Sequence, residues 1–201
     1  MRVDTAWLLV LHLGALATRG GPLQAQQETP RERIAVSRME LPQVPTDSNR
    51  SFERRIVDAL ERDTSSPTVM VPDEMVRRLQ RAGQLEAWQR VIFTFVTAGI
   101  VDPIDLAATC ELLEVDRILR VEAAALVDRR PVYAHGQVLL GTRAVLSAWL
   151  FDCYALDLTW EHWSEGIQQV AVSTSVAGAS SLATVGAVSR AVAELVHTMH
   201  P

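Results

Sequence analysis

Four side chains that could support acid–base or metal chemistry lie close together in the sequence: Asp152, Asp157, Glu161 and His162. Carboxylates and imidazoles bind metal ions and exchange protons near neutral pH. On a regular strand, however, Glu161 and His162 point to opposite faces. Aspartate is also common at turns, because its side chain bonds to local backbone groups. We therefore favour a structural turn, and keep as the alternative a small hydrolase that uses Asp152, Asp157 and His162.

The other histidines beyond residue 25 have less favourable spacing for chemistry. His135 precedes Gly136 in an expected loop. His197 and His200 are three residues apart and could share one face of a helix. A histidine near a helix C-terminus is already favoured by the helix dipole, so neither needs a ligand to explain it. We predict no metal site.

Serines could supply a nucleophile, and Ser173, Ser175, Ser180 and Ser181 lie in one Ser/Ala-rich segment. None occurs in the G-x-S-x-G pattern that exposes a catalytic serine. We expect a mobile loop with some β character over 167–181, with a helix cap at Ser180 or Ser181. The chain has no lysine, which excludes a Schiff base, a Walker A lysine and a Ser-Lys dyad. We therefore predict no catalytic residue and no cofactor.

The first 25 residues have the pattern of a secretory signal peptide. Arg2 supplies a positive charge, residues 6–17 are mostly apolar, and Leu23-Gln24-Ala25 suits a signal peptidase. Cleavage after 15–17 and an uncleaved anchor are the alternatives. No cysteine follows the candidate cleavage sites, so we expect no lipid attachment. The predicted location is periplasmic or secreted.

Cleavage after Ala25 leaves 176 residues, which suits one domain with a proper core. Loss of Arg2, Arg19 and Asp4 changes the formal net charge from −5 to −6. Nucleic-acid binding relies on clustered positive charge, so we expect no nucleic-acid partner. We also expect no transmembrane segment in the mature chain.

The two cysteines, Cys110 and Cys153, allow two interpretations. An exported protein reaches an oxidising compartment, where they could form a disulfide. Alternatively, both are small buried residues: Cys110 shares a helical stripe with Leu106 and Leu113, and Cys153 follows Trp149 and Phe151 on a strand. The sequence leaves both open.

Periodicity and turn residues divide the rest of the chain into strands and helices. We expect a flexible lead over 26–32 and one domain over 33–201. The expected strands are 34–40, 68–71, 116–127, 132–140, 143–154 and 157–163, with a turn at 128–131. The expected helices are 50–62, capped near Thr46–Ser48, then 72–83, 85–98, 102–114 and 185–199. A strand over Val91–Val96 is the alternative within 85–98. The predicted fold class is α/β (α+β): a single domain with a mixed β-sheet flanked by helices.

Residues 143–166 form the most informative stretch. The strand over 143–154 is apolar on both faces and returns as a tryptophan-rich strand, which indicates a buried hairpin at the centre of the sheet. Trp88 and Trp149 are expected in the core. Trp160 and Trp163 face opposite ways on a regular strand, so one of them is a candidate exposed anchor for a partner.

The pattern also resembles a known envelope family. The segment LAATCELLEVDRILRVEA is similar to the middle segment of the α/β domain shared by CsgG, LpoB and the N-terminal domain of TolB. The residues that match are Leu106, Leu112, Val115, Asp116, Ile118 and Leu119. Asp152 and Trp160 match a later "D..TG...W" pattern, although Ala155-Leu156 replaces Thr-Gly and Arg120 replaces a common glycine.

This resemblance implies a non-enzymatic periplasmic domain that binds an envelope protein, as an accessory or assembly factor in cell-wall synthesis or secretion. A periplasmic hydrolase built on the acidic turn is one alternative. A small-ligand carrier with a pocket under 167–181 is the other.

Overall fold

A computed structural model describes residues 31–41, 44–62, 67–134, 137–172 and 175–199. The predicted signal peptide (1–25), most of the lead (26–32), His135, His200 and Ser173 lie outside the described residues. The strands are β1 (Arg33–Val36), β2 (Thr68–Met70), β3 (Arg117–Ala134), β4 (Gln137–Asp152) and β5 (Asp157–Ala171). The helices are α1 (Thr46–Leu60), α2 (Pro72–Arg81), α3 (Leu85–Ala98), α4 (Pro103–Leu113) and α5 (Val176–Thr198).

The described residues form a single domain around a five-stranded mixed sheet, as the sequence predicted. The strand order is β2-β1-β3-β4-β5. β1 is parallel to β2 and to β3, whereas β3, β4 and β5 are antiparallel. The predicted hairpin is present as β4 and β5, but it is not central: β4 lies between β3 and β5, and β5 forms an edge of the sheet.

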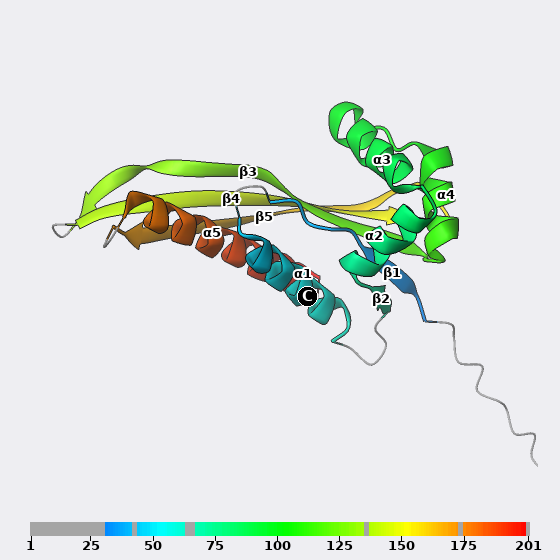
Figure 1. Ribbon diagram of the computed structural model, residues 1–201, viewed down its shortest axis with the longest axis horizontal. Helices are drawn as coiled ribbons and strands as arrows, with labels where there is room; N and C mark the ends of the chain where they lie inside the picture. Colours follow the sequence, from blue (N-terminus) through cyan, green and yellow to red (C-terminus); the bar gives the residue numbers. More distant parts are fainter. Residues whose placement is uncertain (1–30, 42–43, 63–66, 135–136, 173–174, 200–201) are drawn as a thin grey trace, which may run out of the picture.

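Helices cover the two faces of the sheet unequally (Figure 1). α5 and α1 pack on one face, where Leu119, Leu146 and Leu195 belong to one buried cluster. α2, α3 and α4 pack on the other face, but only near β1 and the adjoining ends of β3, β4 and β5. There Phe151, Trp88 and Leu106 belong to a second cluster. The far halves of β3, β4 and β5 therefore have a helix on one side only (Figure 1).

Two helices follow their sequence signals closely. α4 begins after Asp102, whose Oδ1 accepts hydrogen bonds from the backbone N–H groups of Ile104 and Asp105. This is the N-cap that Asp102-Pro103 predicted. Residues 85–98 form α3, so the helical periodicity decided the local structure and the β-branched run over 91–96 did not.

Several predicted boundaries were wrong. β1 ends at Val36, earlier than expected, and α1 begins at Thr46, earlier than residue 50. The predicted turn at 128–131 is absent, because β3 continues to Ala134. Pro131 lies at an irregularity in the pairing between β3 and β4, which is where a strand tolerates a residue without a backbone N–H.

The predicted loop over 167–181 was also wrong. β5 continues to Ala171, and α5 begins at Val176, nine residues before the expected start. Its N-cap is Ser175, whose Oγ accepts a hydrogen bond from the Gly178 backbone N–H, rather than Ser180 or Ser181. Small residues next to this segment let the helix lie close to the sheet: a Cβ atom added at Gly166 would lie 1.9 Å from the Ala187 carbonyl oxygen.

α5 is long and apolar enough to cross a membrane by length and composition alone. The buried residues of this helix include Ala187, Val188 and Leu195, which pack on the sheet. A core helix passes the same test of length and composition, so this finding is weak support for a membrane span.

Candidate functional site

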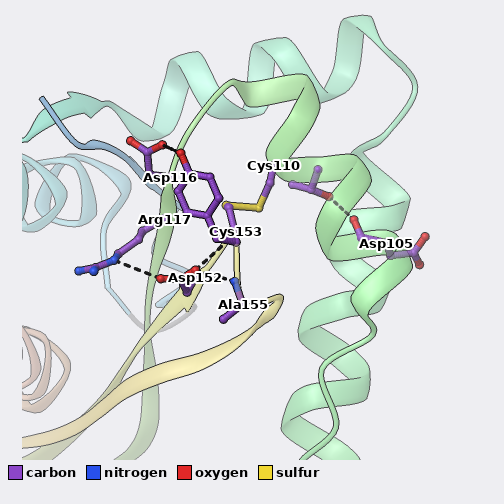
Figure 2. Close-up of a disulfide and its surroundings, with 9 residues drawn as sticks. Asp105, Cys110, Asp116, Arg117, Asp152, Cys153 and Ala155 are labelled. Atoms are coloured by element: carbon purple, nitrogen blue, oxygen red, sulfur yellow. Dashed lines mark hydrogen bonds and ion pairs between the residues drawn. A yellow bond between two sulfur atoms is a disulfide. The ribbon is translucent and has the colours of Figure 1, made fainter. Parts of the chain in front are cut away.

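The acidic turn after β4 is the first candidate, and its side chains have structural partners (Figure 2). Asp152 Oδ1 accepts hydrogen bonds from the backbone N–H groups of Tyr154 and Ala155, both at 2.8 Å. Asp152 Oδ2 lies 3.6 Å from the Arg117 guanidinium on β3. These hydrogen bonds, with Arg117, hold the pKa of Asp152 below its ordinary value, so the carboxylate is charged and fixes the turn.

A second aspartate ties this turn to the start of the sheet. Asp116 Oδ2 accepts a hydrogen bond from the Arg33 backbone N–H at 2.7 Å, and its Oδ1 accepts one from the Tyr154 hydroxyl at 2.8 Å (Figure 2). The backbone hydrogen bond, followed by the tyrosine, lowers the pKa of Asp116. Through these two hydrogen bonds, Asp116 joins β1, the start of β3 and the β4–β5 turn.

A disulfide closes the same region. Cys110 on α4 and Cys153 in the turn are bonded, with their Cα atoms 5.7 Å apart (Figure 2). The sequence left open a disulfide or two buried thiols, and the structure contains the disulfide. Cys153 follows the last residue of β4, so the bond attaches α4 to the β4–β5 turn.

The other acidic-turn candidates do not converge on Asp152. Glu161 Oε1 accepts a hydrogen bond from Trp149 Nε1 at 2.9 Å, on the face that α3 covers. The His162 ring stacks on Trp160, with ring centroids 5.7 Å apart. Trp160 packs against the cluster beneath α5, so Glu161 and His162 lie on opposite faces, as the alternation predicted. Asp157 Oδ1 accepts a hydrogen bond from the backbone N–H of Leu158.

In the part of the chain that the structure describes, no group of three or more His, Cys, Asp or Glu side chains is arranged to hold a metal ion. His197 lies exposed in the last turn of α5. Ser175 caps α5, and Ser180 and Ser181 lie within that helix.

The second candidate is the uncovered sheet surface opposite α5, which we call the open face. It consists of the residues on that side of the far halves of β3, β4 and β5: Ala125, Val127, Arg129, Val132, Leu139, Gly141, Arg143, Val145, Trp163, Glu165, Ile167, Gln169 and Ala171. The pairing establishes the shared side, because Arg143 lies opposite both Val127 and Ile167. Ser147, buried on the same side of β4, lies opposite Trp163.

Large apolar side chains are exposed on the open face, and paired strands hold them in place. Trp163 is 58% exposed, and Val127 and Val132 are about half exposed. Arg143 and Glu165 form a two-pronged ion pair between β4 and β5, with nitrogen–oxygen distances of 2.8 and 2.7 Å. The hydrogen bond from Arg143 lowers the pKa of Glu165. The result is an apolar surface around an ion pair, with a further positive side chain, the exposed Arg129, on the same face.

The free edge of β5 is less available than this face. The Glu165 backbone N–H donates a hydrogen bond to a Glu194 carboxylate oxygen on α5, at 2.7 Å. A strand added along β5 would have to displace this bond, and such side-chain covering is a common protection of edge strands. The open face is therefore the better candidate binding surface. The sequence left Trp160 and Trp163 as alternatives for the exposed tryptophan, and the structure exposes Trp163. Sequence reasoning missed the neighbours of Trp163, because Val127 and Val132 flank a predicted turn and Ile167 lies in a predicted loop.

No family model and no curated protein sequence matches this chain. Among solved structures, the hypothetical protein CT253 from Chlamydia trachomatis aligns with a TM-score of 0.50 and 11% identity, over 84% of this chain and 95% of that one. This likeness concerns the fold alone.

The LpoB C-terminal domain from Salmonella enterica aligns with a TM-score of 0.37 and 10% identity, over 71% of this chain and 87% of that one. Lipoprotein GNA1162 from Neisseria meningitidis aligns with a TM-score of 0.38 and 14% identity, over 83% of this chain and 99% of that one. These low scores carry no argument about function. The family resemblance to CsgG, LpoB and TolB stays a prediction.

Proposed function

We propose that this chain is an exported, non-enzymatic domain that binds another protein in the bacterial cell envelope. The observation that carries the proposal is the open face, where Trp163 is exposed on a sheet that lacks a helix on that side. Exposed tryptophans on ordered surfaces are frequent anchors of protein interfaces. Large apolar patches exposed on a protein surface often mark interaction sites.

The disulfide supports export. Disulfides persist in oxidising compartments and are rare in reducing ones. The bond between Cys110 and Cys153 agrees with the signal peptide predicted over 1–25. A cleaved signal peptide, an absent lipid anchor and a periplasmic or secreted location are parts of the proposal.

The acidic turn supports binding over hydrolysis. Both oxygens of Asp152 have partners within the fold, and Glu161 and His162 face opposite sides of the sheet. A general base needs a free oxygen within reach of a substrate proton. The side chains of the hydrolase hypothesis therefore have a structural explanation in the turn.

The partner is expected to present an apolar patch that accommodates Trp163. Its rim should be polar and carry a negative charge for the exposed Arg129, because Arg143 and Glu165 already neutralise each other. The resemblance to envelope proteins directs the search to cell-wall synthesis or secretion, where this domain would act as an accessory or assembly factor.

Site-specific photocrosslinking in the native envelope tests the proposal. A photoreactive amino acid replaces Trp163 in one protein and Leu182 in a second; Leu182 is 64% exposed on α5, on the other side of the sheet. We expect one dominant envelope protein to be crosslinked from position 163 and not from position 182. Equal patterns from both positions, or no product from position 163, would contradict the proposal.

A further inference from the structure

A groove of about 460 Å³ lies at the covered end of the sheet, between α2, α3 and β3. Its apolar wall includes Leu79, Trp88 and Ile92. Phe93 and Val96 form its outer rim and are 69% and 51% exposed. A groove of this size that combines an apolar wall with polar groups is typical of small-molecule sites. It lies on the same side of the sheet as the open face and adjoins it, because Glu122 lies opposite Ser147, which in turn lies opposite Trp163. The residues that carry the inference, Arg120 and Ser37, do not belong to the open face.

The floor of the groove contains two buried polar side chains. Arg120 is 8% exposed: its Nη1 donates a hydrogen bond to the Arg38 carbonyl oxygen at 3.1 Å, and its Nη2 donates one to Glu122 Oε2 at 3.2 Å. Its Nε has no hydrogen-bond partner among the described residues. Ser37 is 2% exposed, and its Oγ likewise has no partner there.

Unpaired buried donors are unfavourable, because burial removes their hydrogen bonds to water. The Arg120 Nε–H and the Ser37 hydroxyl lie beneath the apolar wall and are themselves shielded from solvent, so small rotations of these two side chains must bring them to the surface of the groove. An oxygen acceptor on a bound molecule would satisfy them. The rest of that molecule would cover Trp88, Ile92 and the exposed rim.

The charges around the floor indicate that this acceptor is uncharged. The Arg120 guanidinium is paired with Glu122, and Arg38 is paired with Asp73. Glu40 also lines the groove. A carboxylate ligand would meet guanidinium groups that are already neutralised, and it would lose its hydration on entry. A carbonyl oxygen accepts the same hydrogen bonds at a much lower cost of desolvation.

We infer that this groove binds an uncharged amphiphile, with an apolar chain against α2 and α3 and an amide or ester carbonyl on Arg120 and Ser37. The chain length is limited by the groove, so short acyl amides and esters fit the inference. The Ser37 hydroxyl and the Arg120 Nε–H fix the orientation of the carbonyl, while the rim residues Phe93 and Val96 cover the chain.

Isothermal titration calorimetry of the purified protein with octanamide, octanoate and octylamine tests this inference. We expect octanamide to bind at one site, and the charged analogues to bind at least tenfold more weakly. Ser37→Ala should weaken octanamide binding several-fold. Saturable binding of octanoate as tight as that of octanamide, or no binding of octanamide, would overturn the inference.

Two exposed valines provide a matched pair of variants. Neither valine belongs to the core, so neither change is expected to unfold the protein. Val96→Arg puts a charged side chain at the rim of the groove, whereas Val127→Arg makes the same change on the open face; the two valines are 51% and 52% exposed. We expect Val96→Arg to weaken octanamide binding at least tenfold and Val127→Arg to leave it unchanged. Equal effects of the two variants would overturn the inference.

Discussion

The two halves of the long β3–β4–β5 sheet are built differently. In the half near β1, helices cover both faces, so Leu119 and Phe151 are buried on opposite sides. The disulfide and the aspartates of the β4–β5 turn close the end of this half. In the far half, α5 covers one face and the other remains open, with Trp163 and Val127 exposed.

We expect the covered half to determine the stability of the domain, and the open face to determine binding. Side chains of the covered half have many partners, so changes there should alter the free energy of unfolding. Side chains of the open face have few, so changes there should alter binding while the fold persists. Each prediction below tests one side of this comparison.

Removal of the disulfide should have the largest effect on stability. The bond joins residues 43 positions apart, and a loop of that length corresponds to about 4 kcal/mol of unfolding free energy. We expect the double variant Cys110→Ala, Cys153→Ala to lose about this amount in urea unfolding followed by tryptophan fluorescence. Chemical reduction of the unaltered protein should give a similar loss. A loss below about 1 kcal/mol would show that the turn is held without the bond.

Gly166→Ala should be the next most damaging change. The added methyl group would lie 1.9 Å from the Ala187 carbonyl oxygen and 2.6 Å from the Ala191 nitrogen, so α5 must move away from the sheet. We expect a loss of about 3 kcal/mol, at the upper end of ordinary overpacking. Urea unfolding measures this loss, which reports the close contact between α5 and the far half of the sheet.

Gly186→Ala is the matched control on the same interface. Its added methyl group meets only the flexible Gln168 side chain, at 2.6 Å from Cγ. That side chain can move, and alanine is about 1 kcal/mol better than glycine within a helix. We expect a stability within about 1 kcal/mol of the unaltered protein. Equal losses for the two glycines would contradict the proposed close approach at Gly166.

Asp152→Ala should cost about 1–3 kcal/mol, because it leaves the Tyr154 and Ala155 backbone N–H groups without their acceptor. Asp157→Ala, which removes a carboxylate from the same turn, loses only the bond from Leu158 and should cost less. Thermal unfolding of both variants measures the difference. The hydrolase hypothesis instead predicts that Asp152→Ala abolishes an activity and leaves the melting temperature unchanged.

Acid should weaken the covered half through Asp116 and Asp152. The pKa of each carboxyl is lower in the folded protein than its ordinary value of 3.8. Such groups contribute stability that is complete above the unfolded pKa and is lost as the pH falls through the folded pKa. The unaltered protein should therefore lose stability below about pH 4.

Asp116→Asn tests this pH dependence, because it keeps an acceptor oxygen but cannot be protonated in this range. We expect its unfolding free energy to fall less between pH 6 and pH 3 than that of the unaltered protein. Asp47→Asn, on the exposed first turn of α1, controls for the loss of one negative charge. Identical pH slopes for the Asp116 and Asp47 variants would contradict the structural role of Asp116.

Local signals in the sequence predicted much of the covered half. Asp102-Pro103 defined the start of α4, and the helical spacing of Leu85, Trp88 and Ile92 defined α3. These signals work because capping and helical periodicity depend on residues within one or two turns. The disulfide was left open, because pairing of Cys110 with Cys153 depends on a distance set by the whole fold.

The far half could not be predicted in the same way. β3 passes through Pro131 and α5 begins in an Ala/Ser/Gly segment, and both patterns resemble loops when they are considered locally. Their structures depend on long-range contacts, such as α5 on Gly166. Of the residues on the open face, the sequence consequently indicated only Trp163, and that as one of two alternatives with Trp160.

The most direct test of the account compares Trp163→Ser with Leu182→Ser, two changes of exposed apolar residues on opposite sides of the sheet. Each is assayed for its melting temperature and for capture of the envelope partner identified by crosslinking. We predict that both keep the unfolding free energy within about 0.5 kcal/mol, and that only Trp163→Ser loses capture, by tenfold or more. Undiminished capture by a folded Trp163→Ser protein would contradict the account.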